Sequence, residues 1–226
     1  MKRDLTIIAL LFCLAGLCGG CRQRAEAQNR ETPAAAVVTD YAAAYESVIS
    51  LYKDAYPDGH TYGEYACQIG LSEYISSAAH VGYALRDLDG DGTPELLIAA
   101  MGEGDMSGGV LFEIDTLTDG VPVQLACSSA RNRWYLCKDN TLLNEGSGGA
   151  GHSAFVLNRV EGDRLIPTEA VITFFDNSPA DGFYHQAGGC SYEPRPEDTA
   201  LEEQVFHSYV TAWERERLVP PLKEII

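Results

Sequence analysis

Residues 81–100 read VGYALRDLDGDGTPELLIAA, which is two short apolar runs joined by an acidic segment with two glycines. Short apolar runs bounded by turn-forming residues are typical of β-strands, so this stretch predicts a strand, a turn and a second strand. Similar runs recur as far as residue 175 at intervals of roughly 8–12 residues, the spacing of many all-β folds. We therefore expect a central antiparallel β-meander over residues 81–175.

The strands of this meander are expected where the apolar runs lie, with hairpin turns between them. Turn-forming residues stand at 118–120 (Thr-Asp-Gly), 138–140 (Lys-Asp-Asn) and 161–163 (Glu-Gly-Asp). The strands are expected at residues 81–86, 95–100, 110–116, 121–127, 133–137, 141–145, 153–159 and 164–174.

Amphipathic helices are expected on both sides of the meander. Residues 39–56 carry apolar side chains at helical spacing, and Pro-Asp-Gly at 57–59 would end this helix. A shorter helix is expected at residues 71–79. Thr-Ala-Leu-Glu at 199–202 matches a capping box and predicts a third helix. The apolar positions of the first and third helices are Tyr41, Tyr45, Val48, Ile49 and Tyr52, and Leu201, Val205, Tyr209 and Trp213.

The expected fold class is α+β, because helices at both ends enclose an antiparallel sheet. One domain over residues 38–226 is favoured over two small ones, and the meander can also be divided into two blade-like units. The chain has 226 residues, of which 46% are hydrophobic, and this is enough for a core. Its net charge of -17 disfavours a nucleic-acid partner, since a phosphate backbone would be repelled.

The N-terminal residues have the organisation of an export signal. Lys2 and Arg3 precede an apolar run over residues 5–17, which is too short to span a bilayer comfortably. The run ends in Cys-Gly-Gly-Cys at 18–21, and here the chain resembles bacterial lipoprotein signal peptides, in which small residues precede a lipidated cysteine. The resemblance implies a signal peptide over residues 1–20 and lipidation of Cys21. Cleavage before Cys18 and an ordinary secretory signal are the alternatives.

Residues 21–37 lack apolar periodicity and predict a flexible tether. A lipid on Cys21 would anchor the protein to a membrane in an extracytoplasmic location. The tether would then hold the folded domain about 20 Å from the lipid surface.

Export permits disulfides, and four cysteines follow the signal: Cys67, Cys127, Cys137 and Cys190. Four cysteines allow three pairings. Cys127 and Cys137 lie symmetrically about Asn132, so a hairpin that turns there would place them opposite each other. A Cys127–Cys137 disulfide, with Cys67 and Cys190 as the remaining pair, is one expectation, and free buried thiols are the other.

The segment from Asp87 to Glu95 carries carboxylates at its first, third, fifth and ninth positions. Calcium takes roughly 6–8 oxygen ligands, and this spacing lets a short segment wrap around one cation. Gly92 allows the bend. The alternative is a hydrated acidic turn, although these carboxylates repel one another unless a cation lies among them. The expected Ca2+ ligands are Asp87, Asp89, Asp91, Glu95 and the backbone carbonyl of Thr93.

This segment resembles the Asp-x-Asp-x-Asp-Gly calcium loops of EF-hands, dockerins and FG-GAP or VCBS β-propeller repeats. An EF-hand needs a glutamate at position twelve, where Ile98 stands, and helices where strands are expected. In FG-GAP-like loops position nine closes the site, and Glu95 occupies it; residues 81–127 would form one such four-stranded unit. The apolar twelfth position predicts weak binding of a structural ion, with a Kd of about 0.1–1 mM.

The pattern from the signal through the acidic loop to residues 135–139 is also similar to uncharacterised lipoproteins of Firmicutes. That resemblance implies no activity.

Residues 146–153, Gly-Ser-Gly-Gly-Ala-Gly-His-Ser, form a second unusual segment. A tight loop between two strands is the favoured interpretation, and a hydrolase site with Ser147, His152 and Ser153 is the other. A catalytic pair of carboxylates could come from the other acidic residues, but no spacing selects two of them. The Gly/Pro-rich stretch over residues 176–196 could supply an aromatic binding surface, with loop packing as the alternative. The residues concerned are Asp105, Asp176 and Glu193 for the carboxylates, and Tyr184, His185 and Tyr192 for the surface.

The sequence therefore predicts a lipid-anchored, extracytoplasmic calcium-binding protein that acts as a non-catalytic binding or structural module for a protein or glycan ligand. The alternative is a secreted hydrolase with its site around residues 146–153.

Overall fold

The computed structural model describes residues 40–55, 80–101, 109–129 and 131–225. The expected signal peptide, the tether and the helix at residues 71–79 lie outside these residues. The helices and strands are, in chain order, α1 (Tyr41–Ala44), α2 (Glu46–Ala55), β1 (His80–Arg86), β2 (Glu95–Met101), β3 (Val110–Thr118), β4 (Val121–Cys127), β5 (Asn132–Leu136), β6 (Leu142–Gly149), β7 (His152–Glu161), β8 (Arg164–Phe174), β9 (Gly182–Ala187), β10 (Thr199–Leu201), α4 (Glu203–Arg215) and β11 (Lys223–Glu224).

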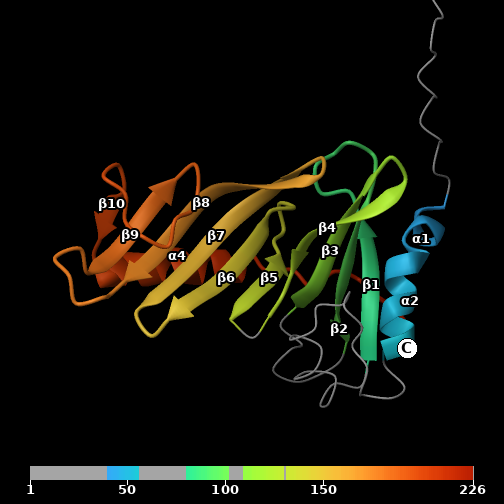
Figure 1. Ribbon diagram of the computed structural model, residues 1–226, viewed down its shortest axis with the longest axis horizontal. Helices are drawn as coiled ribbons and strands as arrows, with labels where there is room; N and C mark the ends of the chain where they lie inside the picture. The colour runs from blue at the N-terminus through green and yellow to red at the C-terminus, as the bar shows by residue number, and fades with distance from the viewer. Residues whose placement is uncertain (1–39, 56–79, 102–108, 130, 226) are drawn as a thin grey trace, which may run out of the picture. The chain divides into compact units, whose positions relative to one another are not determined.

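The strands of the described residues form one antiparallel sheet (Figure 1). Their order is β10-β9-β8-β7-β6-β5-β3-β2-β1-β11, and β4 pairs with β3 outside this path. Strands β1 to β4 form one meander, and β5 to β10 form a second. The two belong to the same sheet because β5 pairs with β3, through Val110 with Tyr135 and Leu111 with Trp134. The α+β class with a central β-meander is confirmed, but the meander is not divided into two separate blades.

Helices α1 and α2 arise from the residues whose helical spacing predicted them. Asp40 caps α1, because its Oδ1 accepts a hydrogen bond of 3.2 Å from Ala43 N. Four of the five predicted apolar positions are buried and join strand residues in one core cluster, whereas Tyr41 is half-buried. Trp213 of α4 also packs against this cluster. Helix α2 and Tyr45, the C-cap residue of α1, therefore contribute to the core on one face of the sheet, whereas α1 itself has no buried residue. The buried helical residues are Tyr45, Val48, Ile49 and Tyr52.

Helix α4 begins later than the capping box predicts. Residues Thr199–Leu201 form β10, which pairs with Phe183, Tyr184 and His185 of β9. Glu202 is the N-cap and makes no side-chain capping hydrogen bond. The capping-box prediction is wrong, because pairing at the sheet edge holds these residues in an extended conformation. The inward residue of the helix also differs, since Phe206 is buried and Val205 is 43% exposed.

The C-terminal segment returns across the sheet after α4. Lys138 N donates to Glu216 O over 2.9 Å, and Leu218 N donates to Leu136 O over 2.8 Å. Further on, β11 pairs with β1. The segment over residues 216–225 thus forms hydrogen bonds with strands of both meanders, and the sequence pattern did not reveal it.

The predicted Cys127–Cys137 disulfide is wrong. Cys137 is a free, buried thiol, whereas Cys127 is disulfide-bonded to a partner outside the described residues. Strand β4 pairs with the second half of β3, where Cys127 lies opposite Glu113, and β5 pairs with the first residues of β3. The two strands follow one another along one edge of β3, so they do not form the hairpin that would bring the thiols together. Cys190 is also free, which excludes the Cys67–Cys190 pair.

Replacing Phe206 should test the orientation of α4. Phe206 lies 6.1 Å from Phe155 and 5.0 Å from Phe183 between ring centroids, so Phe206→Ala leaves a cavity. We expect the free energy of unfolding in urea to fall by about 3–5 kcal/mol. The neighbouring Val205→Ala should change it by less than about 0.5 kcal/mol. A larger loss for Val205→Ala than for Phe206→Ala would show that the opposite helix face is inward.

Candidate metal centre

The acidic segment forms the connection between β1 and β2, whose terminal residues Arg86 and Glu95 are paired. Asp87 closes the turn with its side chain, because Oδ1 accepts from Gly90 N over 2.7 Å and Oδ2 accepts from Gly92 N over 3.0 Å. Gly90 and Gly92 have φ angles of 82° and 90°. This left-handed backbone is accessible to glycine without steric cost, so the two glycines are needed for the turn.

Three of the predicted ligands come together. Asp87, Asp89 and Glu95 each offer a carboxylate oxygen within 4.8 Å of the others. Two ligands of one calcium ion can lie up to about 5 Å apart, because each Ca–O distance is roughly 2.3–2.6 Å. In the part of the chain that the structure describes, no Lys or Arg forms an ion pair with these carboxylates. The donor set is therefore hard oxygen with uncompensated negative charge, which suits a divalent cation such as Ca2+.

Glu95 is the buried member of this group and is only 1% exposed. Its Oε2 accepts from Leu88 N over 2.8 Å, and its Oε1 accepts from Thr116 Oγ1 over 3.1 Å. Burial raises the pKa of Glu95 to about 7, although these hydrogen bonds oppose the shift. A cation at this position would offset the cost of burying the charged form.

Asp91 lies outside this group of side chains, whereas the Thr93 carbonyl stays a predicted ligand, because the group consists of carboxylates alone. The Asp91 side chain is exposed, and its Oδ1 accepts from Thr93 N over 2.6 Å. Sequence spacing placed Asp91 with the other ligands, but in the turn its carboxylate accepts a hydrogen bond from the backbone of Thr93. The acidic cluster of the described residues thus contains Asp87, Asp89 and Glu95.

Several segments far apart in the sequence hold the loop. Tyr41 Oη donates to Gly92 O over 3.1 Å, and Tyr45 Oη donates to Pro94 O over 2.9 Å. From the turn between β5 and β6, Asn140 Nδ2 donates to Asp87 O over 3.1 Å. From the turn between β7 and β8, Gly162 N donates to Asp89 Oδ2 over 3.0 Å. The loop, which belongs to the first meander, is consequently joined to helix α1 and to two turns of the second meander.

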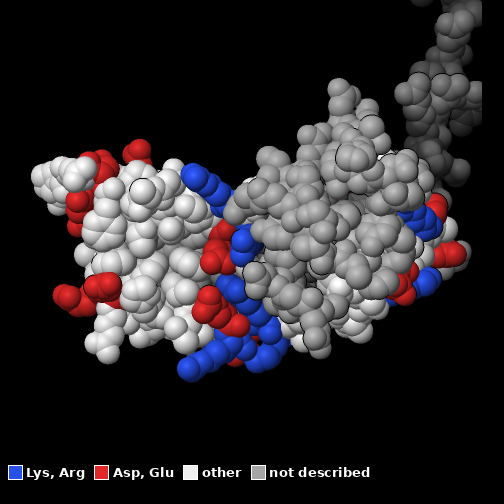
Figure 2. Space-filling view, turned by 90° about the horizontal axis from the view of Figure 1, so that it is seen from below, with Lys and Arg blue, Asp and Glu red and all other residues white. Residues whose placement is uncertain are grey.

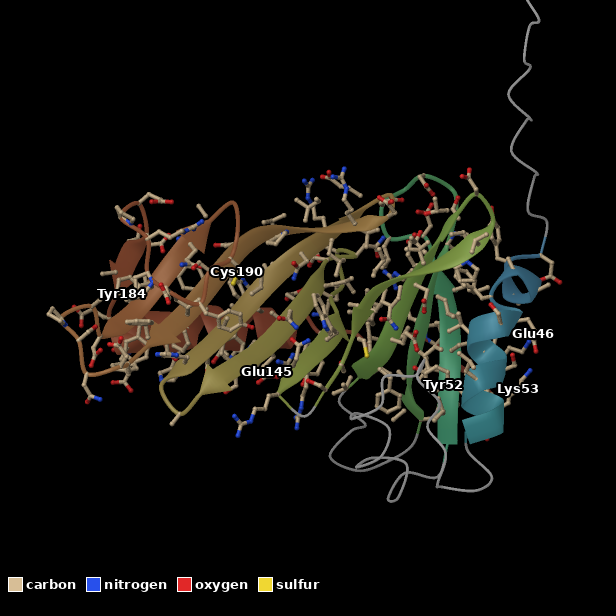
Figure 3. All side chains as sticks on the ribbon, in the orientation of Figure 1. Glu46, Tyr52, Lys53, Glu145, Tyr184 and Cys190 are labelled. Atoms are coloured by element: carbon tan, nitrogen blue, oxygen red, sulfur yellow. The ribbon has the colours of Figure 1, made fainter. Side chains whose placement is uncertain are left out.

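A second pair of acids, Glu113 and Asp115, lies in the core beneath α2. They are 4% and 2% exposed and project from β3 on the same face, since they stand two residues apart. Tyr52 Oη and Gln124 Nε2 both donate to the Glu113 carboxylate. Figure 3 shows Tyr52 on the side of α2 that faces the strands, whereas Glu46 and Lys53 point away.

Asp115 Oδ2 has no hydrogen-bond partner among the described residues. Burial, with a smaller effect from the nearby Glu113, raises the pKa of Asp115 to about 8, and burial raises the pKa of Glu113 as well. Sequence reasoning missed this pair. The sequence signal that could have revealed the pair is that Glu113 and Asp115 stand two residues apart within the otherwise apolar run of residues 110–116.

The residues of the hydrolase hypothesis do not form a catalytic arrangement. Strand β6 continues to Gly149 and β7 starts at His152, so the predicted tight loop between two strands is confirmed. The Ser147 hydroxyl donates hydrogen bonds to the backbone carbonyls of Gly149 and His152. The His152 ring stacks on Phe174 at 4.9 Å, and its buried Nε2 has no partner within the described residues. No serine hydroxyl of the described residues bonds to this ring.

The remaining predicted surface residues are dispersed. Tyr184 and His185 are successive residues of β9 and lie on opposite faces of the sheet. His185 Nε2 lies 2.7 Å from Glu169 Oε1, and its ring stacks on Tyr209 of α4. Asp105 is outside the described residues, and Asp176 and Glu193 do not belong to the acidic cluster.

No protein-family model, curated protein or solved structure matches this chain significantly. Within the described residues, no helix has the length and apolarity needed to cross a membrane.

From the burial of Glu113 and Asp115 we expect the stability of the protein to fall as the pH rises. Because the pKa of Asp115 is raised in the folded state, its contribution is fully present below about pH 4 and is lost as the pH passes about 8. We expect the free energy of unfolding, measured in chelator, to decrease between about pH 5 and pH 8. The decrease should be smaller for Asp115→Asn, which cannot ionise. Identical pH profiles for the two proteins would contradict this account.

Proposed function

We propose that this chain is a calcium-binding module in which Asp87, Asp89 and Glu95 supply carboxylate ligands to one ion. The observation that carries the proposal is the convergence of three carboxylates within 4.8 Å, one of them buried, on a loop closed by two left-handed glycines. Oxygen ligands from a flexible turn are the chemistry that Ca2+ prefers. Asp91 and the Thr93 carbonyl are the further ligands that the sequence resemblance suggests.

The role proposed for the ion is structural. Hydrogen bonds from Tyr41, Tyr45, Asn140 and Gly162 converge on the same loop, so an ion there would hold helix α1 and two turns in place together. Weak binding in the range of extracellular modules fits this role, since the ion would always be present outside a cell.

We also propose that the module is exported and held at a membrane by a lipid on Cys21. The support is the sequence of residues 1–21, with its basic start, short apolar run and Cys-Gly-Gly-Cys ending. The role proposed at the cell surface is a non-catalytic binding or structural one, and its support is that the Ser147 hydroxyl meets the backbone carbonyl of His152 rather than the imidazole ring.

Calcium should raise the thermal stability of the protein. At about 10 mM Ca2+ and a Kd of about 0.1–1 mM, binding stabilises the folded state by about 1.4–2.7 kcal/mol. For a domain of this size, the Tm measured by calorimetry should then rise by roughly 3–10 °C.

Asp89→Asn should reduce that rise by at least half, because it removes a carboxylate of the cluster. The control is Asp119→Asn, which removes the same charge from an exposed turn between β3 and β4 and should leave the calcium response unchanged. A wild-type Tm that does not respond to calcium would refute the metal centre.

Lipidation predicts detergent-phase partitioning that depends on Cys21. Expressed in a bacterial host, the wild-type protein should enter the detergent phase of a temperature-induced phase separation. Cys21→Ser should move it to the aqueous phase, and Cys18→Ser should leave it unchanged. Release by Cys18→Ser alone would assign the lipid to the other cysteine, and an aqueous wild-type protein would argue for an ordinary secretory signal.

A further inference from the structure

Cys127 forms a disulfide whose partner is a cysteine outside the described residues. The chain contains seven cysteines, and two of the described ones, Cys137 and Cys190, are free thiols. These two are therefore excluded as partners. The candidates that remain are Cys13, Cys18, Cys21 and Cys67.

The side chain of Cys127 lies on the face of the sheet that α2 covers. Cys127 is the last residue of β4 and pairs with Glu113 of β3, and paired residues share a face in an antiparallel sheet. The Glu113 carboxylate accepts a hydrogen bond from Tyr52 Oη of α2. The partner of Cys127 must therefore reach the sheet on the side of α2.

The chain leaves α2 close to this position. Ala55, the last residue of α2, follows Tyr52 by three residues. Cys67 comes twelve residues later, and an extended chain of that length can span up to about 40 Å. After a further thirteen residues the chain enters β1 at His80. Cys67 thus belongs to a connection between α2 and β1, and both of these elements contribute to the same core cluster.

The other three candidates belong to the export signal proposed above. Removal of residues 1–20 takes away Cys13 and Cys18, and a lipid on Cys21 occupies its sulfur. This elimination rests on the proposed export and lipidation. The argument from the position of Cys127 on the α2 face does not.

We propose that Cys127 is disulfide-bonded to Cys67. The two thiols are oxidised by a disulfide donor of the extracytoplasmic space. One S–S bond forms, and two electrons and two protons pass to the donor, which becomes a dithiol. Such a bond persists in an oxidising compartment and is rare in a reducing one. The disulfide of Cys127 therefore favours export on grounds other than the signal sequence.

The bond closes a covalent ring around the first meander, because residues 67–127 contain β1 to β4 and the acidic loop. A cross-link between residues so far apart removes many conformations from the unfolded chain and thereby stabilises the folded state. The net charge of -17 opposes folding through self-repulsion. Figure 2 shows acidic side chains at its left end that have no basic neighbour, so part of this charge is uncompensated. The cross-link offsets that repulsion without depending on salt or calcium.

Peptide mapping without reduction tests the pairing. Trypsin cleaves after Arg86, so it separates a peptide of residues 54–86, which contains Cys67, from one of residues 87–131, which contains Cys127. The exported wild-type protein, alkylated before digestion, should yield these two peptides as one linked species that separates on reduction. Recovery of the second peptide in alkylated form, or linked to any other peptide, would overturn the pairing.

Thermal unfolding measures what the bond contributes. Cys67→Ser and Cys127→Ser should each lower the Tm by roughly 8–16 °C, and the double variant should lower it no further. A reductant should lower the wild-type Tm by the same amount and leave the double variant unchanged. The control, Cys190→Ala, removes a thiol that is already free and should keep the full response to reductant.

A wild-type Tm that does not respond to reductant would contradict the stabilising role of the bond. Both measurements are made in chelator, so their failure leaves the metal centre intact, and a missing calcium response leaves the disulfide intact. Detergent-phase partitioning reports lipidation separately, whereas a peptide that joins Cys127 to Cys21 would refute the pairing and the lipid anchor together.

Discussion

Two residue pairs between β3 and β5 hold the two meanders in one sheet. Strand β4 occupies only the second half of the β3 edge, which leaves Val110 and Leu111 available to β5. Ser128 lies where β4 ends and β5 begins to pair with β3. Its Oγ donates to Leu111 O over 2.5 Å, and its backbone N donates to Phe112 O over 2.9 Å. The same Oγ accepts a hydrogen bond from Trp134 N over 3.1 Å. One short polar side chain thus satisfies backbone groups of both strands at this junction, so the alignment of β5 to β10 with the first four strands depends on this point.

The acidic character of the chain extends into its interior. Glu95, Glu113 and Asp115 are all buried, and burial raises the pKa of each. Folding therefore favours their neutral forms, and for Glu95 a bound cation is the alternative to a proton. The proton concentration and the concentration of the proposed cation would consequently act on the stability of the same region, which contains Tyr45, α2 and β1 to β3.

The sequence predicts local features of this protein well and distant pairings poorly. Eight strands of the meander appear near their expected positions, because alternating apolar runs and turns such as Asp119-Gly120 are local signals. Strands β9, β10 and β11 were missed. Strands β10 and β11 are short edge strands of three and two residues, and such strands depend on their neighbours, whereas β9 lies between β8 and β10 in a Gly/Pro-rich part of the chain. The symmetry of Cys127 and Cys137 about Asn132 suggested a hairpin, but it carried no information about β3, which both strands use. Spacing identified Asp87, Asp89 and Glu95, whereas the direction of Asp91 and the burial of Glu113 and Asp115 depend on the turn and on α2.

The last described residues pair with the first strand of the sheet, β1. Gly82 and Tyr83 of β1 pair with Glu224 and Lys223 of β11, and Ile225 N donates to Val81 O over 2.9 Å. Among the described residues β11 thus covers one edge of β1, and an open strand edge is the kind of surface that recruits other chains into aggregates. The last strand of the sequence therefore protects the first one, and removal of residues 223–225 would expose the edge of β1 that it covers.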